Sequence, residues 1–251
     1  MKVMIRRLSW VLLLCGSMLG IQAVLAESTA EATIRAAIEK GVPRVRIAEI
    51  SPSPITGIYR VTTEQGPVLY STADGSHFIV GDLYRLTGAG AINVSEEGRA
   101  QERVKLLSEI KPEEMVIFPG QPSDHAITIF SDVDCGACRE LHKMVPALNK
   151  AGIEVRYLAF PREGLSSATH DKMVSVWCAK ERQQAFTDAK AGKKVPTARC
   201  SNPVAKEYAL GLKLGVQGTP AIILADGQLI PGMVPFENLV AAVKGEPGAA
   251  E

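Results

Sequence analysis

An apolar run of strand length leads directly into two cysteines that are separated by two residues, Cys135 and Cys138. The run, residues 126–130, is rich in β-branched side chains, and residues 139–149 after the pair have apolar residues at helical spacing. Residues 153–160 have the pattern of a second strand. The order strand, helix, strand around a Cys-x-x-Cys pair is typical of a thioredoxin-like redox motif.

The position of the pair at a helix start predicts a different role for each thiol. Cys135 would lie beside unsatisfied backbone N–H groups and the positive end of the helix dipole, which favour the reactive thiolate. Cys138 would lie one turn inside the helix, less exposed, and would act second by releasing Cys135 from a mixed disulfide. Gly136 and Ala137 form the loop between them. This chemistry needs no cofactor, and we expect none and no metal.

The first 26 residues have the pattern of an export signal. Three basic residues precede an apolar stretch over residues 8–19, and small residues at 24–26 offer a cleavage site before Glu27. The stretch is shorter than the roughly 20 residues that span a membrane. We therefore predict a cleaved signal peptide, and we expect Cys15 within it to have no role.

Removal of this segment leaves four cysteines out of five and, because its three basic residues go with it, 25 basic against 27 acidic residues. Nothing in that balance suggests nucleic acid. An even number of cysteines in an exported chain suggests two disulfides, and the simplest pairing leaves Cys178 with Cys200. Two alternatives remain open, since these two could be buried free thiols, or one of them could join Cys135 and Cys138 in a zinc site.

Residues 27–94 have the pattern of a small antiparallel sheet with one helix. A short amphipathic helix over 31–40 precedes four strand-like runs that turn residues separate. A piece of roughly 65 residues would be marginal alone, and association with a second copy would stabilise it. We therefore predict an interaction domain, followed by a charged, solvated connector helix over 95–112, with Ser95 as its N-cap, and a redox domain over 113–251.

The second half of the redox domain supplies the remaining elements of a thioredoxin-like sheet. Mostly helical stretches over 167–192 and 204–214 come first, then a strand, a hairpin at Asp226-Gly227 and an amphipathic helix over 235–244. Pro220 opens that strand after Gly218-Thr219, where a cis bond is predicted. In such a fold this loop lies against the cysteines, which would leave the backbone of Thr219 free to pair with a substrate peptide.

The chain resembles the DsbC/DsbG family of periplasmic disulfide isomerases, and it is more similar to the DsbC members than to the DsbG members. The matching segments span nearly the whole chain after residue 26: Val68-Leu69-Tyr70, Asp74-Gly75, Cys135-Gly136-Ala137-Cys138, residues 155–165, Trp177-Cys178-Ala179-Lys180, Tyr208-Ala209-Leu210-Gly211 and residues 215–221.

The resemblance implies an α+β cystatin-like dimerisation domain, a linker helix and an α/β thioredoxin-like domain with a helical insertion. It implies a periplasmic homodimer that holds misfolded disulfide-containing exported proteins in a cleft, and a membrane reductase of the DsbD type that keeps the active pair reduced. By residue, it implies that Cys135 attacks, Cys138 resolves, Thr219 and Pro220 contact the substrate, and Cys178–Cys200 is a structural disulfide.

Two departures from related patterns affect the redox balance. DsbC-like enzymes usually have a tyrosine where this chain has Ala137, and the central residues of the motif help to set thiol pKa and redox poise. Thioredoxin carries a buried aspartate in the strand before the motif, whereas this chain has Ile129 at the equivalent position by spacing. We therefore expect no carboxylate there that could accept a proton. His125, Asp132 and Asp134 lie nearby in the sequence, and we expect each of them to be solvated.

Three further functions are compatible with parts of this pattern. A thiol oxidase would share the fold, but we would expect it to be a monomer without the front domain. A thiol-independent chaperone would be a dimer in which the cysteines are incidental. A zinc-binding structural module would use the first cysteine pair as ligands. Replacement of Cys135 by serine separates these functions from an isomerase.

Overall fold

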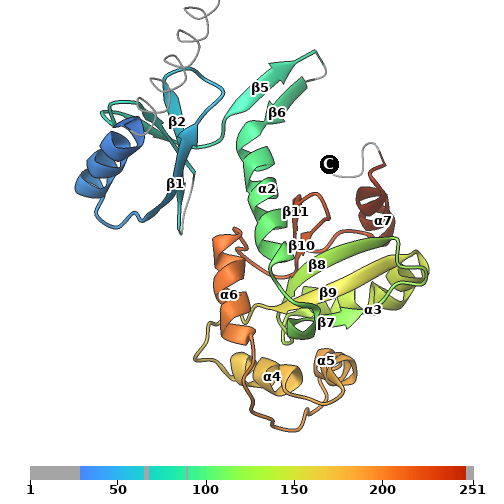
Figure 1. Ribbon diagram of the computed structural model, residues 1–251. Coiled ribbons are helices and arrows are strands. Elements are labelled where there is room, and N and C mark those ends of the chain that lie inside the picture. The colour runs from blue at the N-terminus through green and yellow to red at the C-terminus, as the bar shows by residue number, and fades with distance from the viewer. Residues whose placement is uncertain (1–28, 65–67, 89, 247–251) are drawn as a thin grey trace, which may run out of the picture. The chain divides into compact units, whose positions relative to one another are not determined.

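The computed structural model describes residues 29–64, 68–88 and 90–246. The chain divides into two compact units, Met1–Leu83 and Tyr84–Glu251 (Figure 1). The predicted signal peptide, with Cys15 and the expected cleavage before Glu27, lies outside the described residues. Within the described ranges, no helix combines the length and apolar character that a membrane crossing requires.

The first unit is the predicted antiparallel sheet with one helix. Residues 29–41 are helical, and the sheet has the order β1-β2-β3-β4 with every neighbouring pair antiparallel. Its strands are β1 (Ile47–Pro52), β2 (Ile58–Thr63), β3 (Leu69–Thr72) and β4 (Phe78–Val80). The helix buries one face on the sheet, and the core consists of Ile34, Ile38, Ile47, Ile50, Val61 and Leu69.

The edge strand β4 is apolar and exposed. Phe78, Ile79 and Val80 are 45%, 67% and 56% exposed within this chain. An edge strand with unpaired backbone groups and apolar side chains favours association with another chain. The exposed edge at β4 is therefore the part of the first unit best suited to association with another chain.

The second unit begins with two elements, and sequence reasoning missed one of them. The hairpin of β5 (Tyr84–Thr87) and β6 (Gly90–Asn93) was not predicted. The helix α2 (Val94–Ser108) was predicted, but its N-cap is Asn93, whose side chain accepts a hydrogen bond from the Glu96 N–H, and not Ser95.

The expectation that α2 is a solvated connector is wrong in one respect, because Arg103 is only 3% exposed. Its guanidinium donates to the carbonyls of Leu214 and Gly227, both at 3.1 Å, and pairs with Glu96 at 2.5 Å. At Gly227 a Cβ atom would lie 2.0 Å from the Ala100 carbonyl oxygen, so only glycine allows the hairpin to approach the helix this closely. The helix is thus packed onto the second unit.

A five-stranded sheet in the order β11-β10-β8-β9-β7 forms the centre of the second unit. The predicted strand, helix, strand unit is confirmed: β8 (His125–Ser131) and β9 (Ile153–Ala159) run parallel and are joined by α3 (Gly136–Lys150). The hairpin of β10 (Ala221–Ile223) and β11 (Leu229–Pro231) adds to β8 in the antiparallel sense. The other edge, β7 (Val116–Phe118), follows the 3-10 turn η1 (Pro112–Glu114) and was not predicted.

Helices cover both faces of this sheet because alternate strand residues point to opposite sides. Ile127, Ile129 and Tyr157 pack with Leu141 of α3 and Leu239 of α7 (Phe236–Lys244). On the other face, Phe130, Leu158 and Phe160 pack with the region around α6 (Val204–Lys213) and the end of α2.

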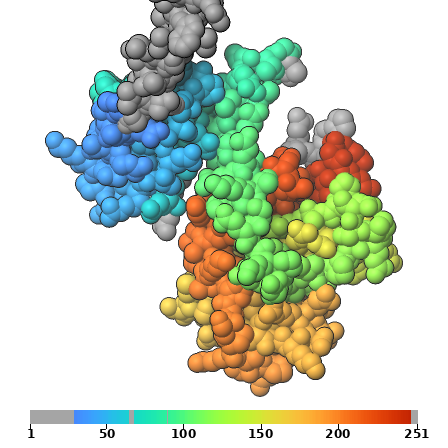
Figure 2. Space-filling view, in the orientation of Figure 1, coloured from blue at the N-terminus to red at the C-terminus, as the bar shows by residue number. Residues whose placement is uncertain are grey.

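The predicted helical insertion consists of α4 (Ala168–Trp177) and α5 (Arg182–Lys190), and the chain then returns through α6. In Figure 2 these segments, coloured amber to orange, form one continuous surface of the second unit. Trp177 and Phe186 from the insertion are fully buried in the same core as α3.

Candidate active site

Cys135 is the N-cap of α3, immediately after the loop that follows β8. Its backbone is extended (φ −77°, ψ 124°), and its Sγ accepts a hydrogen bond from the Cys138 N–H at 3.4 Å. The sulfur therefore occupies the place of the oxygen that usually caps a helix, beside the positive end of the helix dipole. Both cysteines are unbonded thiols; Cys135 is 4% exposed and Cys138 0%, whereas Gly136 and Ala137 between them are exposed.

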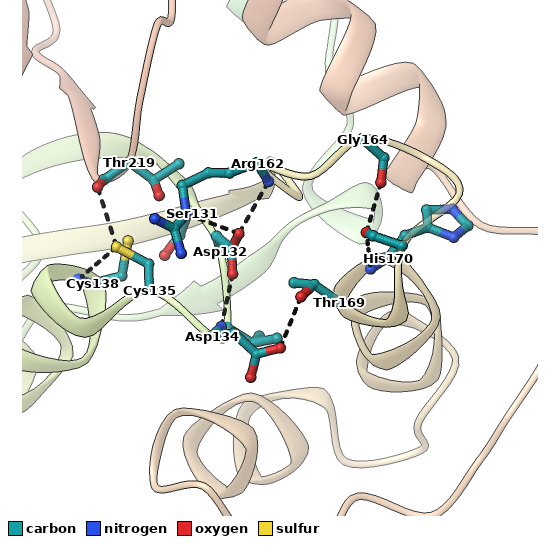
Figure 3. A network of polar contacts seen from close by, with 12 residues as sticks. Ser131, Asp132, Asp134, Cys135, Cys138, Arg162, Gly164, Thr169, His170 and Thr219 are labelled. Atoms are coloured by element: carbon teal, nitrogen blue, oxygen red, sulfur yellow. Dashed lines mark hydrogen bonds and ion pairs between the residues drawn. The ribbon is translucent and has the colours of Figure 1, made fainter.

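The loop that contains Thr219 and Pro220 faces Cys135. Their peptide bond is cis, as the sequence predicts. Ala221, the next residue, pairs with Phe130 of β8, so the sheet itself holds this loop opposite the strand end from which the cysteine loop departs. The Cys135 thiol donates to the Thr219 carbonyl at 3.2 Å (Figure 3).

The surroundings of Cys135 favour its thiolate. Burial raises the pKa of this thiol, but the Thr219 side chain, the Cys138 N–H and the Arg162 guanidinium together outweigh burial, so the pKa lies below its ordinary value. A lowered pKa increases the share of the thiolate, which is the nucleophilic form, at any pH below the ordinary thiol pKa.

The surroundings of Cys138 have the opposite net effect. Burial raises the pKa of this thiol above its ordinary value, and the positive charge of Lys190 is the largest influence in the other direction. The two sulfurs, one turn apart, are thus set apart in acidity, and the one with the lower pKa lies at the helix end.

Asp132 corrects an expectation, since it is 1% exposed and not a solvated loop residue. Its carboxylate accepts from the Asp134 N–H at 2.7 Å, and from the Arg162 N–H and Nε at 3.0 and 3.1 Å (Figure 3). These contacts fix the loop before Cys135 and hold a guanidinium beside it. Sequence reasoning missed the roles of Asp132 and Arg162, because the two residues are brought together only by the pairing of β8 with β9.

The other two polar residues near the motif lie in different settings. Asp134 is partly buried and accepts from Thr169 Oγ1 and Lys172 Nζ, both at 2.8 Å, which links the cysteine loop to α4. His125 begins β8, at the end of the strand opposite the cysteine loop. Neither residue contacts a cysteine sulfur in the interactions that the structure records.

The remaining two cysteines form a disulfide with each other. The Sγ atoms of Cys178 and Cys200 are bonded at 2.03 Å, with 22 residues of sequence separation. Neither is then available to join Cys135 and Cys138 around a zinc ion. Within the described residues there is no cluster of three or more His, Cys, Asp or Glu side chains that could hold a metal.

A reduced pair with one acidic sulfur can form a mixed disulfide and then release it. The two sulfurs lie where a thioredoxin-like sheet gives way to its first crossover helix, opposite a cis-proline loop. Fold and site together define a thiol–disulfide oxidoreductase of the thioredoxin-like class.

Comparisons with known proteins agree with this class. The family described as "Thioredoxin-like domain" matches residues 112–245, and "Disulfide bond isomerase protein N-terminal domain" matches residues 25–96. The chain is 42% identical to the thiol:disulfide interchange protein DsbC of Escherichia coli, over 81% of this chain and 85% of that protein. For the DsbC of Haemophilus influenzae the identity is 36%, over 83% and 90%. The chain belongs to the DsbC family of thiol:disulfide interchange proteins.

A solved structure shows the same relationship for part of the chain. The crystal structure of a disulfide interchange protein from Neisseria gonorrhoeae matches with a TM-score of 0.50 and 25% identity, over 55% of this chain and 98% of that chain. Disulfide interchange is thus favoured over the thiol-independent chaperone, the zinc module and the oxidase.

Proposed function

We propose that this protein rearranges wrong disulfides in exported proteins through a mixed disulfide at Cys135. The thiolate of Cys135 attacks one sulfur of a substrate disulfide, a Cys135–substrate bond forms, and the other substrate sulfur leaves as a thiolate. If that thiolate attacks another disulfide and the chain of exchanges returns to Cys135, the substrate is isomerised. If Cys138 attacks Cys135 instead, the substrate is reduced and the enzyme is left oxidised.

One observation carries this proposal: the Cys135 sulfur lies between the Cys138 N–H and the Thr219 carbonyl, at 3.4 and 3.2 Å. Donors on the helix side favour a thiolate there. On the other side, the backbone of the Thr219–Pro220 loop is positioned to pair with an extended substrate segment that crosses the sulfur. Gly136 and Ala137 are exposed and leave this approach open.

The first unit mediates dimerisation and helps to bind the substrate. Its small core and the exposed apolar edge strand β4 support a homodimer in which residues 27–94 form the dimerisation domain, 95–112 the linker and 113–251 the catalytic domain.

The location we propose is the periplasm, after cleavage of residues 1–26. The signal-like pattern of that segment and the Cys178–Cys200 disulfide both support an oxidising compartment. Because Cys135 and Cys138 must be reduced to act there, a membrane thiol reductase of the DsbD type would have to supply electrons.

The test is recovery of activity from a scrambled protein with several disulfides. We expect the unsubstituted chain to restore activity and Cys135→Ser to fall to the uncatalysed rate. Suppression of aggregation of a cysteine-free client controls for folding, and we expect Cys135→Ser to retain it. Equal recovery with both chains would contradict the proposal and would favour a thiol-independent chaperone.

A further inference from the structure

Lys190 is a buried lysine that the activity proposed above does not yet use. It is the last residue of α5, is only 4% exposed, and lies with its Nζ 5.0 Å from the centre of the Phe186 ring. Within the described part of the chain, no carboxylate forms an ion pair with it. A buried ammonium without a counterion is costly, so a group that benefits from its charge is to be sought nearby.

The Nζ of Lys190 is hydrogen-bonded to the end of β8, directly before the cysteine loop. It donates to Ser131 Oγ at 2.6 Å and to the Asp132 carbonyl oxygen at 2.8 Å. The positive charge of Lys190 and the Ser131 hydroxyl each lower the pKa of the Cys138 thiol, against the larger effect of burial, which raises it. The ammonium is thus held at the strand end from which the loop to Cys135 departs.

No ionisable side chain stands at the position where thioredoxin carries its buried aspartate beside the cysteines. Ile129, where thioredoxin carries an aspartate, is fully buried and apolar. The titratable groups that face Lys190 are the two thiols and Arg139 at the start of α3, Asp132 in the loop, and His142 further along α3. Burial lowers the pKa of Lys190 to about 8, while the sulfurs and Asp132 act to raise it, so the amine is mostly charged near neutral pH.

We propose that Lys190 is a positioning residue for the second step of the exchange, in which Cys138 resolves the mixed disulfide at Cys135. Its buried ammonium, fixed by hydrogen bonds to Ser131 and Asp132, stabilises the thiolate of Cys138 in that step. This inference rests on the proposed function, in which Cys138 is the resolving thiol. Because the charge lies on the Cys138 side, it acts on release of the substrate more than on the first attack.

The step balances in atoms and electrons. Cys138 gives up its proton to water, and its sulfur attacks the sulfur of Cys135. The Cys135–Cys138 bond forms as the bond from Cys135 to the substrate breaks, and the substrate sulfur leaves as a thiolate with the bonding electron pair. Lys190 remains an ammonium throughout and lowers the free energy of the Cys138 thiolate.

The test is stopped-flow reaction of the reduced protein with an aromatic disulfide whose thiolate is coloured. Attack by Cys135 releases one equivalent in a phase that depends on reagent concentration. Attack by Cys138 releases the second in a phase that does not. Lys190→Gln keeps hydrogen-bond donors to Ser131 and Asp132 but removes the charge, Lys190→Met removes both, and Lys190→Arg keeps the charge.

We expect Lys190→Gln and Lys190→Met to slow the concentration-independent phase about tenfold near neutral pH, equivalent to a rise of about one unit in the pKa of Cys138, and to shift its pH profile upward. Lys190→Arg should retain most of the rate. The matched control is Lys193→Met. Lys193 is exposed, lies just after α5 and pairs with Asp188, and this variant should behave as the unsubstituted chain. Near-ultraviolet circular dichroism checks the fold of each variant.

Two results would overturn the role of Lys190: an unchanged concentration-independent phase in Lys190→Gln, or an equal loss in the Gln and Arg variants with no shift of the pH profile, which is the behaviour of a purely structural residue. Absence of that phase in the unsubstituted chain would instead contradict resolution by Cys138, and with it the proposed function.

Discussion

The two cysteine pairs of this protein lie in one compact unit, yet the first cysteine of each pair stands at the opposite end of a helix. Cys135 is the N-cap of α3, and Cys178 is the C-cap of α4. At the first position backbone N–H groups and the positive end of the dipole favour a thiolate; at the second, carbonyl groups and the negative end disfavour it. The helix end at which a cysteine stands therefore separates a reactive thiol from a structural one.

The partners of the pairs differ in the same direction. Cys135 and Cys138 lie among positive groups, Arg162 on one side and Lys190 on the other. Next to Cys178, the indole of Trp177 donates to the carboxyl group of Glu207 at 3.3 Å. The first pair is thus surrounded by groups that favour negative charge on sulfur, whereas Cys178 and Cys200 are bonded to each other and carry no thiol.

The largest effect expected is on covalent capture of substrates. In Cys138→Ser the mixed disulfide at Cys135 has no internal thiol to resolve it, so adducts with client proteins should accumulate on non-reducing gels. The double variant Cys178→Ala/Cys200→Ala should give no more adduct than the unsubstituted chain. Adducts that persist in Cys135→Ser/Cys138→Ser would show that the distinction between the two pairs is wrong.

The next effect concerns pH, and it comes from Glu207. Burial raises the pKa of this carboxyl group to about 8, although the Ala159 N–H and Trp177 hydrogen bonds act against the rise. The folded protein therefore keeps a proton that the unfolded chain loses near the ordinary carboxyl pKa of 4.5. The stability that this proton supports is fully present below pH 4.5 and is lost as the pH rises through about 8.

Since the pKa rises from 4.5 to about 8, the loss should amount to about 5 kcal/mol in the free energy of unfolding. Urea unfolding at several pH values should show it in the unsubstituted chain and should show a flatter dependence in Glu207→Gln. The exposed Glu237→Gln is the matched control and should leave the dependence unchanged. Parallel curves for all three chains would contradict a protonated Glu207.

The smallest effect expected is that of removing the Cys178–Cys200 bond. A closed loop with a sequence separation of 22 residues predicts a loss of about 3 kcal/mol in the double alanine variant. Exchange activity per folded molecule should remain, since neither cysteine contacts the Cys135 region. Loss of exchange while circular dichroism still reports a folded chain would give this pair more than a structural role.

Sequence reasoning found the elements that local patterns specify. The strand, helix, strand unit, the four-stranded sheet and the cis bond before Pro220 follow from period, turn residues and a proline at a strand start. The strand β7 and the hairpin β5–β6 were not predicted.

The charged residues around the cysteines could not be predicted from local patterns. Asp132 and Lys190 stand in polar stretches that look solvated, and they become buried only when α5 packs under the end of β8. Arg103 lies in a helix of mostly charged or polar residues, and the two carbonyls that it binds are more than a hundred positions away. Burial of a charge depends on tertiary partners, which a single sequence does not display.

Arg103 also affects how precisely the Thr219–Pro220 loop is positioned. Its two backbone acceptors, the carbonyls of Leu214 and Gly227, bracket the segment that contains Thr219 and Pro220. One guanidinium therefore fastens both ends of that segment to the same helix, which restricts the conformational freedom of the chain between them. Together with the pairing of Ala221 and Phe130, Arg103 thus limits where the loop that faces Cys135 can lie, although it contacts neither Thr219 nor Cys135 in the hydrogen bonds given above.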